Sequence, residues 1–90
     1  MSYKVELSKR ALKQLYGLER KTQLLVAAAI SEIESVDNPT MLPNAKKLQG
    51  VDNGWRWRAG SYRIIGTVDG KRIVVEVFRV GHRRDVHQNM

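Results

Sequence analysis

The chain has 90 residues, a formal net charge of +7 and no cysteine. Ninety residues support a single small core, so we expect residues 1–90 to form one domain whose function lies on its surface. The lack of cysteine excludes disulfides and thiolate metal sites and fits a reducing compartment, of which the cytoplasm is the default.

A strand followed by two helices is expected in the N-terminal half. Residues 3–7 alternate apolar and polar side chains, as a short strand does, and lack the apolar core of a secretion signal. Ser8 occupies the position of a helix N-cap, and the helix that follows should end near Gly17. A second helix is predicted for Lys21–Val36, where an Asp-Asn-Pro sequence stops it. Its longest apolar run, residues 24–30, is too short to cross a bilayer, so no membrane contact is expected.

The C-terminal half is predicted to be a long loop followed by antiparallel strands. Residues 38–54 hold both prolines and three asparagines, which favours a loop. A type I′ turn at Asp69-Gly70 should lead into the last strand. That register would set Arg63 opposite Glu76, where the two could form an ordinary ion pair. The sequence therefore predicts an α+β fold, with the N-terminal strand and a helix hairpin packed on a mostly antiparallel four-stranded sheet.

Aromatic residues and arginines alternate in the first predicted hairpin, which separates two faces of the sheet. The expected core face carries Trp55, Trp57, Tyr62, Ile64, Val75 and Val77, and the other face carries Arg56, Arg58, Arg63 and Glu76. A turn at Gly60-Ser61 would place Arg58 directly across from Arg63. A turn at Ala59-Gly60 would place Arg56 there instead. Like charges in that position cost stability, so either register suggests an anionic ligand.

The positive charge is concentrated in the C-terminal half. Residues 1–45 carry a net charge of +1, and residues 46–90 carry +6. A basic surface with interleaved aromatic residues is typical of nucleic-acid binding, although anionic proteins and membrane surfaces attract the same surface. Charge alone therefore leaves the class of partner open.

Three segments carry a resemblance to a known family. They are Lys46-Lys47-Leu48-Gln49-Gly50, then Trp57-Arg58-Ala59-Gly60-Ser61-Tyr62-Arg63-Ile64-Ile65, then Val80-Gly81-His82-Arg83-Arg84-Asp85-Val86. In this order and spacing, and with the opening strand and helices, the chain resembles the RelE/ParE toxin superfamily over nearly its whole length. RelE-type members cut mRNA in the ribosomal A site and are silenced by an antitoxin. ParE-type members keep the fold and poison DNA gyrase.

The resemblance implies a toxin of a type II toxin–antitoxin system that acts as a ribosome-dependent endoribonuclease. Its implied partners are an antitoxin protein, the ribosome and mRNA. The implied reaction is attack of the RNA 2′-hydroxyl on the phosphodiester, which needs neither a metal nor another cofactor. It needs a base, a cation at the phosphate and an acid at the leaving oxygen. A gyrase-poisoning relative and a non-catalytic basic module that binds a partner stay open as alternatives.

The resemblance also assigns residues to these roles. The catalytic positions correspond to Arg56, Arg58, Arg63, Arg83 and His87. Arg63 and Arg83 are the candidates for stabilising the phosphate, because the planar guanidinium matches phosphate oxygens. His87 stands where the family usually has tyrosine. Its imidazole could transfer a proton near neutral pH, or the residue could be a natural variant or an attenuating change. The residues expected to contact RNA or the ribosome are Lys46, Lys47, His82 and Arg84.

Overall fold

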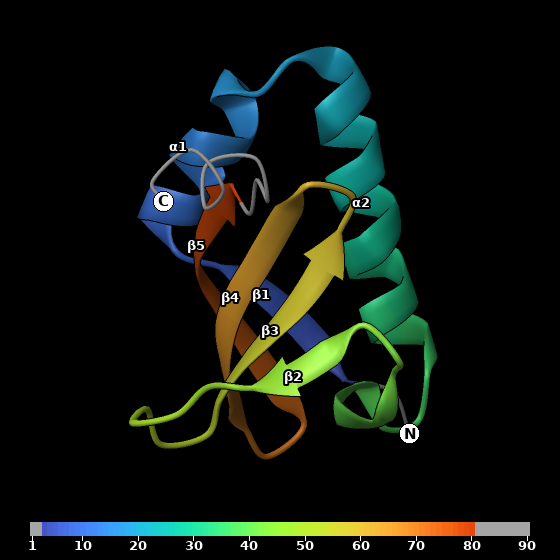
Figure 1. Ribbon diagram of the computed structural model, residues 1–90, viewed down its shortest axis with the longest axis vertical. Helices are drawn as coiled ribbons and strands as arrows, with labels where there is room; N and C mark the ends of the chain where they lie inside the picture. Colours follow the sequence, from blue (N-terminus) through green and yellow to red (C-terminus); the bar gives the residue numbers. More distant parts are fainter. Residues whose placement is uncertain (1–2, 81–90) are drawn as a thin grey trace, which may run out of the picture.

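The computed structural model describes residues 3–80, which form an α+β fold with two α-helices, a short 3₁₀ helix and a five-stranded sheet (Figure 1). In chain order the elements are β1 (Lys4–Leu7), α1 (Lys9–Gly17), α2 (Arg20–Ser35), the 3₁₀ helix η1 (Pro39–Met41), β2 (Ala45–Lys47), β3 (Gly54–Ala59), β4 (Tyr62–Asp69) and β5 (Arg72–Val80). The strand order is β1-β5-β4-β3-β2. Only the β1–β5 pair among these strands is parallel, so the sheet is mostly antiparallel as predicted.

The helix hairpin agrees closely with the prediction from the sequence. Ser8 caps α1, because its Oγ accepts a hydrogen bond from the Ala11 amide at 3.0 Å. Gln23 ties the two helices together by donating to the carbonyl oxygens of Leu15 and Tyr16 in the last turn of α1, of which that of Leu15 also accepts from the Leu18 amide. No helix within residues 3–80 is long and apolar enough to cross a membrane.

The segment predicted to be a loop contains the 3₁₀ helix η1 and a fifth strand, β2. Strand β2 pairs with β3 at the edge of the sheet and sets Lys46 opposite Arg56. The 3₁₀ helix accepts a hydrogen bond at the Pro39 carbonyl from Trp57 Nε1, at 3.0 Å. Three residues are too few for an alternating pattern to be visible in the sequence, which is why the expected sheet had four strands.

The register of the last hairpin differs from the prediction, and the expected pairing of Arg63 with Glu76 is wrong. The turn lies at Gly70-Lys71, one residue later than expected, so that Asp69 pairs with Arg72. Gly70 has a φ of 62° and its successor does not have a positive φ, which fits a type II′ turn and not type I′. A β-bulge next to Gly66 leaves Glu76 without a partner in the pairing. Together the two shifts set Arg63 opposite Arg79.

The core lies between the helices and one face of the sheet. Its buried members within residues 3–80 are Ala11, Val26, Ile33, Trp57, Ala59, Ile64, Ile73, Val75 and Phe78. Trp55 packs against this cluster and is half-buried, as is Tyr62. The prediction that Val77 lies in the core is wrong, because the bulge changes the alternation of β5 after Val75. Phe78 enters the core in its place, and Val77 pairs with Ile65 on the opposite face.

Candidate functional site

The face of the sheet opposite the core carries a row of cations that we call the arginine face. Its members are Lys46, Arg56, Arg58, Arg63 and Arg79. They come from four adjacent strands, and each is set directly across from another cation: Lys46 from Arg56, Arg58 from Arg63, and Arg63 from Arg79. Residues opposed in this way have Cβ atoms about 4.5–5.5 Å apart. The sheet register therefore brings the predicted arginines together.

The turn at Gly60-Ser61 decides between the two registers that the sequence left open. Ala59 pairs with Tyr62, and Gly60 has a φ of 62°, as the first position of a type II′ turn requires. A side chain at Gly60 would also meet Leu25 Cδ2 at 2.6 Å. The sheet consequently opposes Arg58, and not Arg56, to Arg63.

The arginine face has no anionic partner within residues 3–80. The ion pairs in this part of the chain join Arg72 to Glu6 at 3.7 Å and to Asp69 at 3.2 Å, at the other end of β4 and β5. None of the guanidinium groups of the arginine face donates a hydrogen bond to another residue of this part of the chain. Opposed like charges destabilise a sheet. The arrangement is therefore suited to an anion that lies across several strands.

Two hollows divide the arginine face. The smaller, of about 240 Å³, lies among Pro43, Asn44, Lys46, Arg56 and Arg58. The larger, of about 540 Å³, is lined by Leu48, Val51, Arg56, Arg63, Ile65 and Arg79. Arg56 lines both hollows, so they adjoin one another. The lining of the first is mostly polar, whereas the second combines cations with aliphatic side chains.

Two residues of the loop between β2 and β3, Leu48 and Val51, line one side of the larger hollow. The Leu48 amide donates to the Gly54 carbonyl at 2.9 Å, and the Gly54 amide donates to the Val51 carbonyl at 3.1 Å. Positive φ angles at Gly50 and Asn53 allow the chain to reverse between these bonds. The loop thus holds Leu48 and the exposed Val51 beside the arginines.

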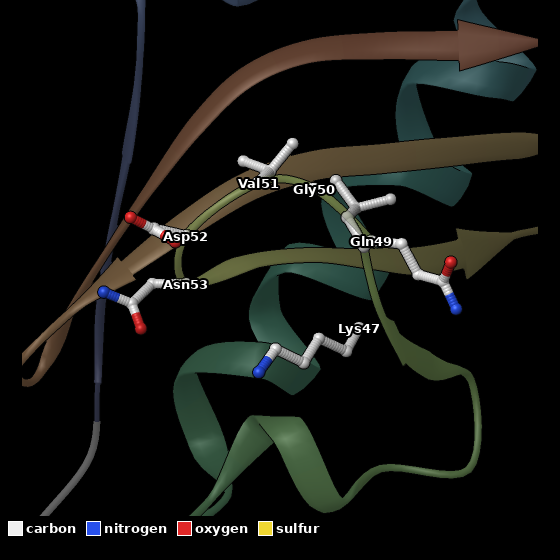
Figure 2. Close-up of a pocket in the computed structure, with 7 residues that line it drawn as sticks. Lys47, Gln49, Gly50, Val51, Asp52 and Asn53 are labelled. Atoms are coloured by element: carbon white, nitrogen blue, oxygen red, sulfur yellow. The ribbon is translucent and has the colours of Figure 1, made fainter.

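The structure separates the two predicted lysines. Lys46 is paired with Arg56 and belongs to the arginine face. Lys47 is the next residue of the strand, so the alternation of side chains places it on the other face of the sheet. It lines a hollow of about 700 Å³ formed by the loop itself (Figure 2), which shares Leu48 and Val51 with the larger hollow. The remaining predicted residues, His82, Arg83, Arg84 and His87, lie outside the residues that the structure describes.

Arg79 is a member of the arginine face that was not predicted from the sequence. Its position follows from the bulge beside Gly66, and a glycine in the interior of a strand is the one sequence signal of such a bulge. No group of three or more His, Cys, Asp or Glu side chains in residues 3–80 is arranged to hold a metal ion.

Comparisons with known proteins place the fold. A family model described as "ParE toxin of type II toxin-antitoxin system, parDE" matches residues 5–87. The comparison with curated protein sequences gives no match. A chain of the archaeal RelE–RelB complex from Pyrococcus horikoshii OT3 is 25% identical with a TM-score of 0.74, and the match covers 92% of this chain and 99% of that one.

Two bacterial structures share the fold at lower identity. A chain of the intact Escherichia coli RelBE toxin–antitoxin complex is 24% identical with a TM-score of 0.68, over 91% of this chain and 100% of that one. A chain of the Staphylococcus aureus YoeB dimer is 15% identical with a TM-score of 0.70, over 91% and 100%. At these identities the likeness shows the fold alone.

Proposed function

The chain belongs to the RelE/ParE superfamily of type II toxin–antitoxin toxins, and we propose that it is a RelE-type member, a ribosome-dependent endoribonuclease that cuts mRNA in the ribosomal A site. The observation that carries this proposal is the convergence of Arg56, Arg58 and Arg63 on one face without an acidic partner in residues 3–80. A protein that inhibits its target by docking alone does not need guanidinium groups gathered in this way. A protein that cleaves a phosphodiester needs such groups to stabilise the charge that grows on the phosphate.

In the proposed reaction the RNA supplies its own nucleophile. The 2′-oxygen attacks the adjacent phosphorus and gives its proton to a base, the bond from phosphorus to the 5′-oxygen breaks, and that oxygen takes a proton from an acid. The products are a cyclic phosphate and a free 5′-hydroxyl. Negative charge grows on the phosphate oxygens in the transition state, where fixed cations stabilise it most. Arg63, flanked by Arg58 and Arg79 across the strands, is proposed to supply this charge.

The C-terminal residues complete the proposed site. Arg83 is proposed to share the stabilisation of the phosphate, and His87 to donate the proton to the leaving oxygen. The residues proposed to contact RNA or the ribosome are Lys46, Lys47, His82 and Arg84, of which the lysines and Arg84 are solvated cations that supply affinity and not chemistry.

The proposed partners follow from the same family. Similar chains occur in complexes with RelB antitoxins, and we propose that a cognate antitoxin protein holds this toxin silent in the cytoplasm. Residues 46–90 carry a net charge of +6. An acidic antitoxin segment would neutralise that charge, and the favourable electrostatic interaction would speed and orient its binding.

A ParE-like toxin that poisons DNA gyrase is the second candidate, because the family model that matches residues 5–87 is that of ParE toxins. Induced expression followed by primer extension separates the two. The RelE-type proposal expects mRNA cut within codons only when ribosomes are present. Intact messages together with blocked DNA supercoiling would replace it with the ParE-like function.

A further inference from the structure

Arg79 lies in the arginine face although the family resemblance gives it no role. Without the bulge, the register from Asp69 to Gly66 would continue and set Phe78 opposite Arg63. The one extra residue turns Phe78 into the core and brings Arg79 across from Arg63 instead. A bulge that redirects a side chain in this way is a common device next to functional sites.

The bulge is fixed by close packing at Gly66 and by hydrogen bonds with Ser8 and Gln14. A Cβ atom at Gly66 would meet the Val74 carbonyl oxygen at 2.7 Å, so this position requires glycine. The Glu76 carbonyl, which has no partner in the sheet pairing, accepts a hydrogen bond from Ser8 Oγ at 2.8 Å. The Phe78 amide donates to Gln14 Oε1 at 2.8 Å. Two backbone groups of β5 next to the bulge are thus satisfied by Ser8, the N-cap of α1, and by Gln14 of α1, and Arg79 is held in a defined register.

The hollow that Arg79 lines has both cationic and aliphatic side chains. Arg63 and Arg79 are opposed across β4 and β5, a spacing at which two guanidinium groups can share the oxygens of one phosphate. Leu48, Val51 and Ile65 line the same hollow. Val51 is 45% exposed, which leaves its methyl groups open to a ligand.

A nucleotide is the ligand class that uses both parts of this hollow. Inorganic phosphate would use the arginines and leave the aliphatic side chains uncovered. An acidic peptide would supply carboxylates without a flat apolar group beside them. A nucleotide joins a phosphate to a planar base, whose faces pack on apolar side chains and on guanidinium planes.

We propose that this hollow is a nucleotide subsite in which Arg63 and Arg79 hold one backbone phosphate of single-stranded RNA and the adjoining base lies against Leu48, Val51 and Ile65. This inference rests on the proposed function, since RNA is the substrate there. It adds Arg79 as a binding residue and gives the loop between β2 and β3 the task of contacting a base.

Direct binding tests the subsite separately from cleavage. The full-length protein is titrated with a fluorescent single-stranded RNA whose 2′-hydroxyls are methylated, so that it cannot be cut, at several salt concentrations. Arg79→Gln should weaken binding about fivefold to fiftyfold and reduce the salt slope by about 0.7, the value for one lost phosphate contact in single strands. Arg10→Gln removes the same charge from the exposed side of α1 and should leave the slope unchanged.

A second variant tests the apolar wall. Val51→Ser removes methyl groups from an exposed position, so the fold should tolerate it. It should weaken binding of the methylated RNA about threefold to tenfold, as expected when the base loses its contact with one or two methyl groups. Binding of tripolyphosphate, which has no base, should stay unchanged.

The outcomes separate the subsite from its alternatives. Equal effects of Arg79→Gln and Arg10→Gln, or no binding of methylated RNA by the parent, would overturn the proposal. A polyglutamate peptide that binds as tightly as RNA and is weakened equally by Val51→Ser would assign the hollow to an acidic protein segment. A parent that binds methylated RNA with the predicted pattern but cuts no mRNA would support the subsite and contradict the endoribonuclease.

Discussion

The two faces of strands β3 to β5 are built from alternate residues of the same chain segments, yet they differ in how their side chains are satisfied. On the core face, Trp57 packs among aliphatic residues and its Nε1 donates to the Pro39 carbonyl. No buried side-chain nitrogen or oxygen in residues 3–80 lacks a hydrogen-bond partner. On the arginine face, cations oppose cations. The side chains of the first face are satisfied within the fold, whereas the cations of the second have no anionic partner within residues 3–80.

The bulge beside Gly66 links the two faces. It places Phe78 in the core and Arg79 in the arginine face in a single step. A change that affects the bulge should therefore affect both stability and binding, whereas a change confined to one face should affect only one of them.

Removing the Trp57 side chain from the core should destabilise the whole fold and have no specific effect on the arginine face. Trp57 is fully buried, so Trp57→Ala should lower the free energy of unfolding by about 3–5 kcal/mol. Trp55→Ala, at a half-buried position of the same strand, is the matched control and should cost less. Urea unfolding followed by tryptophan fluorescence or circular dichroism measures both. Equal losses for the two variants would contradict the assigned core.

Substitutions of His87 distinguish the effect of proton transfer from the effect of the charge on the arginine face. If it is the general acid, His87→Ala should slow cleavage by about 10²–10⁴-fold while binding to ribosomes stays near that of the parent. His87→Tyr should keep or raise the rate, because it restores the residue that the family usually has. Single-turnover cleavage on ribosomes measures this. An unchanged rate in His87→Ala would remove the role, and a parent active only after His87→Tyr would mark an attenuating residue.

Removing one arginine should abolish most cleavage and leave the fold intact. Arg63→Ala should lower the cleavage rate by about 10²–10³-fold, the range for losing one group that stabilises transition-state charge. Arg63→Lys should restore the rate only in part, since lysine lacks the bidentate fork. Arg72→Ala removes the same group from the far end of the sheet and should cleave at the parental rate. A similar loss in both alanine variants would point to net charge and not to position.

Gly66→Ala should affect both faces together. The added Cβ would lie 2.7 Å from the Val74 carbonyl oxygen, so the strands must move apart at the bulge, at a cost of about 1–3 kcal/mol. RNA affinity should fall as well, because Arg79 would lose its register. Gly17→Ala is the control, since its Cβ would meet nothing within 4 Å and its φ is not positive. Gly66→Ala with parental stability and affinity would contradict the role of the bulge.

The smallest effect expected is a gain in stability. Arg58→Gln removes one of two directly opposed cations and should raise the free energy of unfolding by about 0.2–1 kcal/mol at low salt. Added salt screens the repulsion, so the gain should shrink as salt rises. Arg72→Gln loses ion pairs with Glu6 and Asp69 and should show no gain. Chemical unfolding at two salt concentrations decides the matter, and a loss of stability in Arg58→Gln would count against the repulsion.

Local signals in the sequence account for much of the fold. Ser8 before an apolar helical pattern, and Asn38-Pro39 after one, locate the ends of the helices to within one or two residues. The alternation of Trp and Arg assigns β3 correctly to two faces. Two registers of β3 against β4 stayed open, because the alternating pattern alone does not fix whether Ala59-Gly60 or Gly60-Ser61 forms the turn.

The bulge could not be predicted in the same way, because its causes are distant in sequence. The contacts that stabilise it come from Ser8 and Gln14, more than sixty residues before their partners in β5. The last hairpin turn also lies at Gly70-Lys71 and not at the predicted Asp69-Gly70. As a result the sequence predicted Glu76 in the place that Arg79 occupies. Lys46 and Lys47 were predicted together because they share a matched segment, although strand alternation separates their side chains.

If the arginine face serves catalysis at the expense of stability, a double variant should separate the two properties. Arg58→Gln/Arg63→Gln removes an opposed pair of cations from β3 and β4. Its free energy of unfolding and its ribosome-dependent cleavage of mRNA are measured on the same preparation. We expect stability equal to or above that of the parent, with cleavage lowered at least about 10²-fold. Cleavage at the parental rate, or a loss that only follows a fall in stability, would contradict the account.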